Sequence, residues 1–261
     1  MPLGTVYLVG AGPGAPDLLT VRAAKLLARA DIVFHDALVH AETLSLAVRA
    51  EIVPVGKRCG RHSTAQRFIC KRLVDAAQRH ENVVRLKGGD PMLFGRAQEE
   101  IAALEAAGVP YEVVPGITAA LAAAAELGTS LTQRGSVRSL AFATPRSAAN
   151  EDASQWIASV NAADAGALYM GAREAPALAS ALLAAGRCAT TPVAIVESAS
   201  LPESRVVHTT LASLASSGDG AFEGPTMLLI GPQFRPRARH RAAGAGDRAE
   251  SAHARRSGII V

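Results

Sequence analysis

The sequence has few aromatic residues, few cysteines and no long apolar run. Aromatic side chains make up 4% of its 261 residues, although 49% are hydrophobic. The three cysteines, Cys59, Cys70 and Cys188, show no CxxC spacing and no paired framework, which argues against a disulfide scaffold and a zinc site. No stretch reaches about 18 uninterrupted apolar residues, and no basic segment precedes an apolar run at the N-terminus. We therefore expect no membrane span, no signal peptide and no metal, and a reducing cytoplasm as the location.

Most of the chain also lacks an excess of positive charge. The formal charge is +4, from 27 basic and 23 acidic residues, but seven of the arginines lie in residues 235–261. Residues 1–234 hold 20 basic and 21 acidic side chains. A nucleic-acid footprint needs basic residues clustered on a folded face. The sequence therefore predicts no nucleic-acid partner and a basic, disordered tail at residues 235–261.

The N-terminal half contains short β-branched runs that alternate with Ala/Leu-rich helical patterns. Nearly continuous apolar runs of this length are typical of parallel strands buried on both faces. The pattern predicts strands at 5–9, 31–35, 51–55, 82–86 and 111–114, with helices at 18–29, 65–78 and 98–107. This is the order of a parallel βαβ series.

The C-terminal half begins with a long Ala-rich helix, predicted at 118–127. Further strands are predicted at 138–143, 167–170, 193–196, 205–209 and 227–230, with helices at 174–185 and 211–214. The predicted fold class is α/β, with two α/β domains at residues 1–116 and 117–234.

The first predicted strand ends in a glycine-rich loop, Gly10-Ala-Gly-Pro-Gly-Ala-Pro-Asp17. It matches the dinucleotide pattern G-x-G-x-x-[G/A], and Asp36 lies where a ribose-binding acid would follow the second strand. Pro13 and Pro16 remove N–H donors where a pyrophosphate would need them. An NAD-dependent oxidoreductase is thus one alternative, and a turn that lets a helix pack on a strand is another.

Two more predicted strands end in loops of unusual composition, Lys87–Pro91 and Val114–Thr118. Two glycines let the backbone approach a ligand, and Asp90 can accept hydrogen bonds from hydroxyl or ammonium groups. The structural alternative is that Asp90 and Thr118 cap the helices that follow them.

In this order and at this spacing, these motifs together resemble those of one protein family. The chain resembles the uroporphyrinogen-III C-methyltransferases of the tetrapyrrole methylase family in the runs VYLVGAGPGAPDLLT, DIVFHDALV, VGKRCGRHS, VVRLKGGDPMLFGR, VVPGITAALAAA and LYMG. The resemblance extends over about residues 3–231. It implies two α/β domains with the active site between them, and a homodimer. It also implies methylation of uroporphyrinogen III by S-adenosylmethionine, leaving S-adenosylhomocysteine. The product would be precorrin-2, by way of precorrin-1, in sirohaem or cobalamin biosynthesis.

The resemblance also implies which residues contact the methyl donor. The matching positions are Pro13, Gly88, Gly89, Asp90, Leu93, Thr118, Ala119, Met170 and Ala199. Apolar groups such as Leu93 and Met170 would lower the effective dielectric around the sulfonium. Ala199 replaces a glycine of the family's turn, so a left-handed backbone is expected to be strained there.

Two polar residues match the family's catalytic positions. Asp36 matches a proton acceptor and Lys57 a proton donor. A reduced pyrrole carbon that attacks the donor methyl makes the macrocycle cationic, so a proton must leave, and a positioned carboxylate can accept it. Close, collinear approach of the reacting atoms is expected to supply most of the acceleration. The alternatives are a helix N-cap for Asp36 and a solvated loop lysine for Lys57.

Uroporphyrinogen carries eight carboxylates, and such a substrate needs guanidinium and ammonium partners. We expect Lys57, Arg58 and Arg61 to bind it first, since GKRCGRHS is a loop at a strand end. Arg134 is a further candidate from the second domain.

Two departures from the family pattern bear on the substrate. Gln133 stands in place of a histidine in a T-H-R motif, and Pro145 replaces the glycine of a T-G-H segment. A methyltransferase acting on a later cobalt-precorrin is therefore an alternative function. A non-catalytic module that holds nucleic acid through its arginine tail is a third hypothesis.

Overall fold

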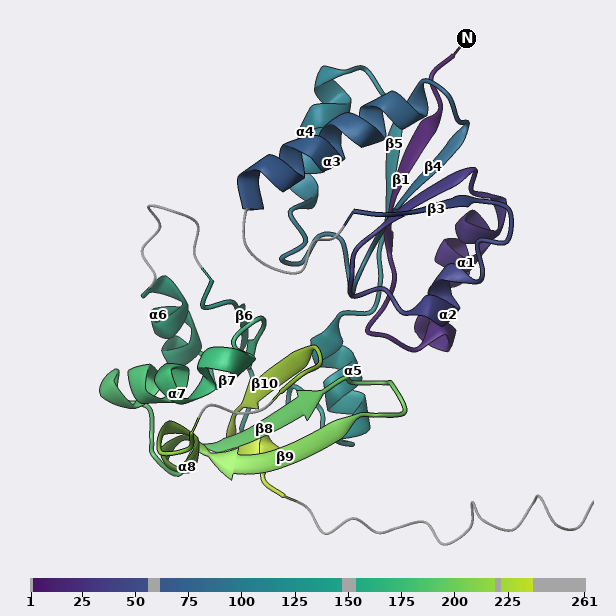
Figure 1. Cartoon of the computed structure of the whole chain (residues 1–261). Helices are drawn as coiled ribbons and strands as arrows, with labels where there is room; N and C mark the ends of the chain where they lie inside the picture. The colour runs from purple at the N-terminus through teal and green to yellow at the C-terminus, as the bar shows by residue number, and fades with distance from the viewer. Residues whose placement is uncertain (1, 56–61, 147–153, 219–221, 237–261) are drawn as a thin grey trace, which may run out of the picture.

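The computed structural model describes residues 2–55, 62–146, 154–218 and 222–236 (Figure 1). They form two five-stranded sheets with helices packed against both faces of each. The α/β fold class predicted from the sequence is confirmed. The chain passes from the first sheet to the second once, between Val114 and Leu140.

The first sheet is entirely parallel, with the strand order β3-β2-β4-β1-β5. Its strands are β1 (Thr5–Gly10), β2 (Ile32–His35), β3 (Glu51–Pro54), β4 (Asn82–Lys87) and β5 (Tyr111–Val114). The helices between them are α1 (Val21–Arg29), α2 (Ala41–Leu44), α3 (His62–Ala77) and α4 (Ala97–Ala106). Parallel strands bring their carboxyl ends to one edge, where ligands bind in open α/β sheets. The loops after the adjacent strands β4, β1 and β5 therefore leave the sheet side by side.

Apolar side chains cover both faces of this sheet. Phe34, Leu73 and Leu104 belong to the core under α3 and α4, and Leu27 and Val84 to the core under α1. This double burial explains why its strands form nearly continuous apolar runs in the sequence.

The second sheet is mixed, with the strand order β6-β7-β10-β8-β9. Only β6 and β7 pair in parallel, and the other three pairings are antiparallel. Its strands are β6 (Leu140–Ala143), β7 (Ala165–Leu168), β8 (Pro192–Glu197), β9 (Arg205–Thr210) and β10 (Thr226–Ile230). Its helices are α5 (Ala119–Glu126), α6 (Gln155–Ala162), α7 (Ala175–Ala184) and α8 (Leu211–Ala215). Helix α5 packs on one face, and α6, α7 and α8 pack on the other.

The structure differs from the sequence prediction at several helices. Helices α2 and α6 were not predicted, and the helix expected at 18–29 is a 3₁₀ turn followed by α1. Helix α1 begins after Thr20 because the Thr20 hydroxyl accepts a hydrogen bond from Ala23 N at 3.2 Å. A threonine at this position satisfies one of the free N–H groups of a first helical turn.

Among the described residues, no helix combines the length and apolar character needed to cross a bilayer. The same part of the chain contains no group of three or more His, Cys, Asp or Glu side chains that could hold a metal ion. Residues 237–261, which make up most of the predicted tail, lie outside the described residues.

Candidate functional site

The loops that follow β1, β4 and β5 are fastened to one another through their backbones. Gly89 N donates to Gly12 O at 2.7 Å, and Gly12 N donates back to Gly89 O at 3.2 Å. Gly116 N, in the loop after β5, donates to Asp90 Oδ2 at 2.9 Å. The three glycine-rich loops singled out in the sequence therefore meet at one place, at the carboxyl edge of the first sheet.

Glycine is required where these loops come closest. A Cβ atom added to Gly116 would lie 2.3 Å from Gly89 O and 2.8 Å from Gly10 Cα. A Cβ atom on Gly10 would lie 2.6 Å from Gly116 Cα. Because these neighbours are backbone atoms, a side chain at either position must push the loops apart.

Gly116→Ala is expected to separate the loops and weaken any ligand that they hold. Overpacking a close contact typically costs about 1–3 kcal/mol, so we expect a lower midpoint of thermal unfolding and about tenfold weaker ligand binding. Calorimetric titration with S-adenosylhomocysteine and thermal unfolding measure the two effects. Gly218→Ala is the matched control, because a Cβ there meets nothing within 4 Å. Equal affinity in both variants would contradict the prediction.

Asp90 links two of the loops with its two carboxylate oxygens. Oδ1 accepts from Met92 N at 2.8 Å, and Oδ2 accepts from Gly116 N. Helix α4 begins only at Ala97, so the alternative that Asp90 caps the next helix is wrong. Its side chain instead fixes the shape of the loop edge.

The loop after β7 in the second sheet lies against this edge. The hydroxyls of Thr118 and Tyr169 are 2.7 Å apart, so the Thr118 side chain bonds Tyr169 and does not cap α5. The Tyr169 ring also packs against Phe94, which follows the Gly-Gly-Asp loop, with 5.0 Å between ring centroids. Burial raises the pKa of Tyr169 despite the bond to Thr118, so the phenol is protonated at neutral pH. Tyr169 belongs to the LYMG motif, of which only Met170, 47% exposed, was expected to contact the methyl donor.

The loop after β8 makes a second contact across the two sheets. Ser200 Oγ accepts from Ala15 N at 3.1 Å, and Ser200 N donates to Glu126 Oε2 at 3.1 Å. The Ser204 hydroxyl donates to the other oxygen of Glu126. Ser200 therefore joins the first glycine-rich loop to α5.

Ser200→Ala is expected to loosen this contact without unfolding the protein. A neutral hydrogen bond contributes about 0.5–1.5 kcal/mol, so the affinity for S-adenosylhomocysteine should fall about threefold to tenfold. Ser180→Ala is the control, because the Ser180 hydroxyl bonds Pro176 O within the same helix, α7. A drop of the same size in both variants, or in neither, would contradict a specific role for Ser200.

Left-handed backbone conformations at non-glycine residues gather in these loops. Within the described residues they occur at Phe94, Arg96, Met170, Ser198 and Ser200. Ala199 is not among them, so the expected strain at Ala199 is wrong: the turn places its left-handed residues on either side. Left-handed non-glycine residues cost free energy and are typical of functional sites.

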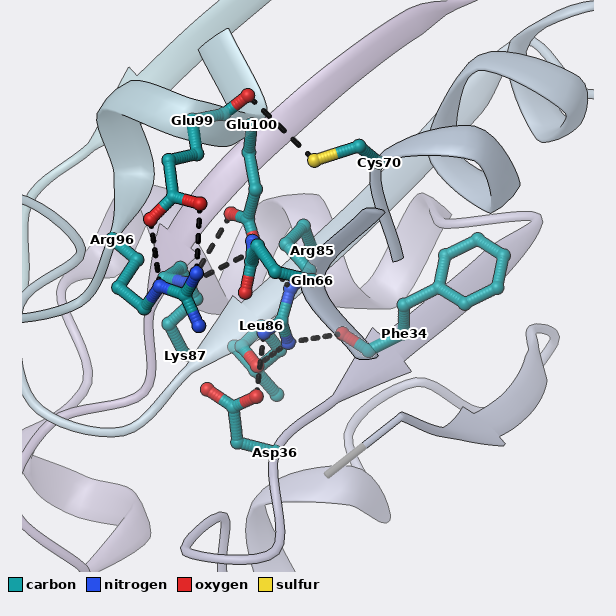
Figure 2. Close-up of polar contacts among 10 residues, drawn as sticks. All are labelled: Phe34, Asp36, Gln66, Cys70, Arg85, Leu86, Lys87, Arg96, Glu99 and Glu100. Atoms are coloured by element: carbon teal, nitrogen blue, oxygen red, sulfur yellow. Dashed lines mark hydrogen bonds and ion pairs between the residues drawn. The ribbon is translucent and has the colours of Figure 1, made fainter. Parts of the chain in front are cut away.

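Asp36 lies at the carboxyl end of β2 and forms an ion pair with Arg85. Arg85 Nη2 donates to Asp36 Oδ1 at 2.5 Å (Figure 2). The residue at the N-cap of α2 is His40, so the alternative that Asp36 caps that helix is wrong. Burial disfavours the charged guanidinium, but the charges of Asp36 and Glu100 outweigh burial and raise the pKa of Arg85.

Arg85 and its neighbours were missed by sequence analysis. The signal was present, because Arg85 and Lys87 interrupt an apolar strand, Val83-Val-Arg-Leu-Lys87. Both side chains point toward α4, where Glu100 is fully buried. Burial and the charge of Arg85 lower the pKa of Lys87.

Open space in front of Gly89 is compatible with a bound molecule. A Cβ on Gly89 would have only Thr118 Cα near it, at 4.0 Å. Pro13 and Leu93 are half-buried. The other expected contacts at this edge, Gly88 and Ala119, are also half-buried.

The expected substrate-binding residues are only partly described. Lys57, Arg58 and Arg61 lie outside the described residues. Arg134 is exposed and lies in a turn closed by the bond from Gln133 N to Val137 O at 2.9 Å.

The dinucleotide alternative does not fit this geometry. A pyrophosphate in such sites rests on the N-terminus of the helix that the glycine loop opens. Here a 3₁₀ turn at Pro16–Leu18 intervenes before α1, and Ala15 N is bonded to Ser200.

Comparison with known proteins gives a consistent result. The sequence model described as Tetrapyrrole (Corrin/Porphyrin) Methylases matches residues 5–215. A crystal structure of uroporphyrin-III C-methyltransferase from Thermus thermophilus, complexed with S-adenyl homocysteine, is similar at a TM-score of 0.77 and 38% identity. The match covers 89% of this chain and 99% of that chain. A cobalt precorrin-4 methyltransferase is similar at a TM-score of 0.75 and 27% identity, over 89% of this chain and 96% of that one.

Curated relatives are longer than this chain. A siroheme synthase from Psychrobacter sp. (strain PRwf-1) is 44% identical over 231 residues, which is 88% of this chain and 47% of the relative. The chain thus spans about half the length of the curated relatives it matches.

Proposed function

Because the chain belongs to the tetrapyrrole methylase family, we propose that it transfers methyl groups from S-adenosylmethionine to uroporphyrinogen III, giving precorrin-2 by way of precorrin-1. The observation that carries the proposal is the meeting of the loops after β1, β4 and β5 with the loops after β7 and β8. The similar Thermus thermophilus methyltransferase, solved with S-adenyl homocysteine, supports the choice of ligand for this edge.

The methyl donor would supply an electrophilic methyl group on a sulfonium. Gly88 and Gly89 would hold it along their backbones, because the space in front of Gly89 is open. The remaining contacts that we propose are Pro13, Asp90, Leu93, Thr118, Ala119, Met170 and Ala199. Asp90 contributes by fixing the loops, since both of its oxygens bind backbone N–H groups.

Asp36 is the proton acceptor in this proposal. It lies on the same sheet edge as the glycine-rich loops, and its side chain is 30% exposed, so it can reach a substrate. A carboxylate there accepts the proton that leaves the macrocycle after methylation. Lys57, which follows β3 in the sequence, would act as the proton donor.

Substrate recognition is assigned to four positively charged side chains. Lys57, Arg58 and Arg61 would bind carboxylates of the tetrapyrrole from the N-terminal domain, and Arg134 would bind them from the C-terminal domain. Guanidinium groups suit this role because they bind carboxylates through two parallel hydrogen bonds.

The proposal also covers the domain boundary, oligomeric state, location and pathway of the enzyme. We place the boundary between its domains at residues 116 and 117, and infer a cytoplasmic homodimer that serves the sirohaem or cobalamin branch. Size measurement of the purified chain by light scattering tests the dimer.

The decisive experiment incubates the full chain with methyl-labelled S-adenosylmethionine and uroporphyrinogen III. Label in precorrin-1 and precorrin-2 is the expected result. Labelling of a cobalt-precorrin alone would favour the second candidate, which the similarity to the cobalt precorrin-4 methyltransferase supports. Binding of NADH without binding of S-adenosylhomocysteine would overturn both. Removal of residues 235–261 should leave methylation intact, which separates this function from a nucleic-acid module.

A further inference from the structure

A cluster of buried charges lies directly behind Asp36. Arg85 is 2% exposed and Glu100 is 0% exposed, and Lys87 and Gln66 are also buried. Figure 2 shows that these side chains converge from β4, α4 and α3, with Asp36 at one end of the cluster. Charged residues are almost never buried this deeply unless they are paired, so the arrangement requires an explanation.

Glu100 is the centre of the cluster. Its Oε1 atom accepts from Arg85 Nε at 3.0 Å, from Lys87 Nζ at 3.1 Å and from Gln66 Nε2 at 3.1 Å. Its Oε2 atom accepts from Lys87 Nζ at 3.1 Å. One carboxylate on α4 therefore fixes two side chains of β4 and one of α3.

Arg85 connects Glu100 to Asp36. While Glu100 binds its Nε atom, Nη1 donates to Phe34 O at 3.4 Å and to Leu86 O at 3.2 Å. The backbone carbonyls of β2 and β4 thus hold the guanidinium group of Arg85 beside Asp36. Its Nη2 atom donates to Asp36 Oδ1. Arg85 thus holds one oxygen of Asp36, whose side chain is 30% exposed at the end of β2.

The cluster contains equal numbers of basic and acidic side chains. Arg85 and Lys87 carry two positive charges, and Glu100 and Asp36 carry two negative ones. Buried charges of this kind act as a unit, because removing one partner leaves another uncompensated.

We propose that Glu100 and Arg85 are positioning residues for the Asp36 carboxylate: Glu100 fixes the guanidinium of Arg85, and Arg85 fixes Asp36 Oδ1 so that Oδ2 faces the proton leaving the methylated tetrapyrrole. The proposal rests on the proposed function, in which Asp36 is the proton acceptor. Neither residue touches the substrate, and both act through Asp36.

The test is a double-mutant cycle between Glu100→Gln and Asp36→Ala. Glutamine keeps the shape of Glu100 and removes its charge. We expect kcat for methyl transfer to fall about tenfold to 100-fold, as for other groups that orient a functional side chain. The KM for S-adenosylmethionine and the affinity for S-adenosylhomocysteine should stay unchanged. In the Asp36→Ala background Glu100→Gln should cost nothing further, because non-additivity is the mark of residues that act together.

Glu112→Gln is the matched control. It removes a carboxylate from the same sheet and breaks the exposed ion pair between Glu112 and Arg22, which are 3.0 Å apart. Its kcat should equal that of the unsubstituted chain. If Glu100→Gln does not fold, Gln66→Ala removes one donor to Glu100 without changing any charge, and should lower kcat by a smaller factor with unchanged ligand affinity.

Several outcomes would overturn the positioning role. These are an unchanged kcat in both Glu100→Gln and Gln66→Ala, a parallel loss of S-adenosylhomocysteine affinity, or a full additional loss in the double variant. An unsubstituted chain that methylates no tetrapyrrole would overturn the proposed function and the positioning role with it. An active chain with additive substitutions overturns the positioning role alone, so the two failures are distinguishable.

Discussion

Replacing Asp36 by alanine is expected to lower kcat for methyl transfer about 10²- to 10⁴-fold, the range supplied by a positioned general base. The affinity for S-adenosylhomocysteine should be unchanged. The reason is spatial: Asp36 follows β2, whereas the glycine-rich loops follow β1, β4 and β5. Single-turnover methylation measures the first quantity, and calorimetric titration measures the second.

Two further variants test whether the loss of activity is specific to the Asp36 carboxylate. Asp36→Asn keeps an oxygen for Arg85 but cannot accept a proton as a carboxylate does, so it should be as inactive as Asp36→Ala. Asp75→Ala removes an acid that pairs with Lys71 on the surface of α3 and should leave activity unchanged. Equal losses of activity and ligand affinity in Asp36→Ala would mean that Asp36 supports the fold rather than the chemistry.

The strands of the parallel sheet could be predicted because the residues that identify each strand are adjacent in the sequence. Short, mostly apolar runs predict strands of a parallel sheet, so residues 82–86 and 111–114 predicted β4 and β5 with nearly the right ends, although Arg85 and Glu112 interrupt them. The loops after β1, β4 and β5 follow parallel strands, whose carboxyl ends lie at one edge of a sheet. The loops do meet, through the Gly12–Gly89 bridge and the bond from Gly116 to Asp90.

The strand order of the second sheet and the contacts of the charge cluster both depend on residues that are far apart in the sequence. A run such as 227–230 predicts a strand but does not indicate that it inserts antiparallel between β7 and β8. Similarly, Asp36 and Arg85 are 49 residues apart, and nothing near either residue identifies the other. An arginine within an apolar strand signals a buried partner, but only the packing of α4 on β4 identifies Glu100 as that partner.

In the turn after β8, backbone strain was predicted at the wrong residue. A missing glycine at Ala199 predicted strain there, because glycine tolerates a left-handed backbone. The turn instead adopts positive φ at Ser198 and Ser200, while Ala199 is buried. The Ser200 hydroxyl then accepts from Ala15 N across the two sheets. This contact helps to explain why a strained residue is retained at the position.

The largest effect on ligand binding is expected from Asp90→Ala. This change removes the acceptor of two backbone N–H groups, from Met92 at 2.8 Å and from Gly116 at 2.9 Å. A hydrogen bond to a charged acceptor contributes about 1.5–3 kcal/mol. If both are lost, the dissociation constant of S-adenosylhomocysteine should rise about 100-fold or more. Calorimetric titration measures it directly, and Asp90→Asn, which keeps one acceptor oxygen, should give an intermediate value.

Asp164 offers a control of the same chemistry in the other sheet. Its Oδ2 atom accepts from the backbone N–H groups of Arg138 and Ser139, at 2.8 Å and 2.9 Å, before β6 and β7 begin. Asp164→Ala therefore removes a comparable loop contact at the opposite end of β7 from Met170. It should lower the midpoint of thermal unfolding while leaving S-adenosylhomocysteine affinity intact. If the two alanine variants weaken the ligand equally, Asp90 acts through overall stability. If Asp90→Ala binds normally, the ligand does not lie at the edge formed by the three loops.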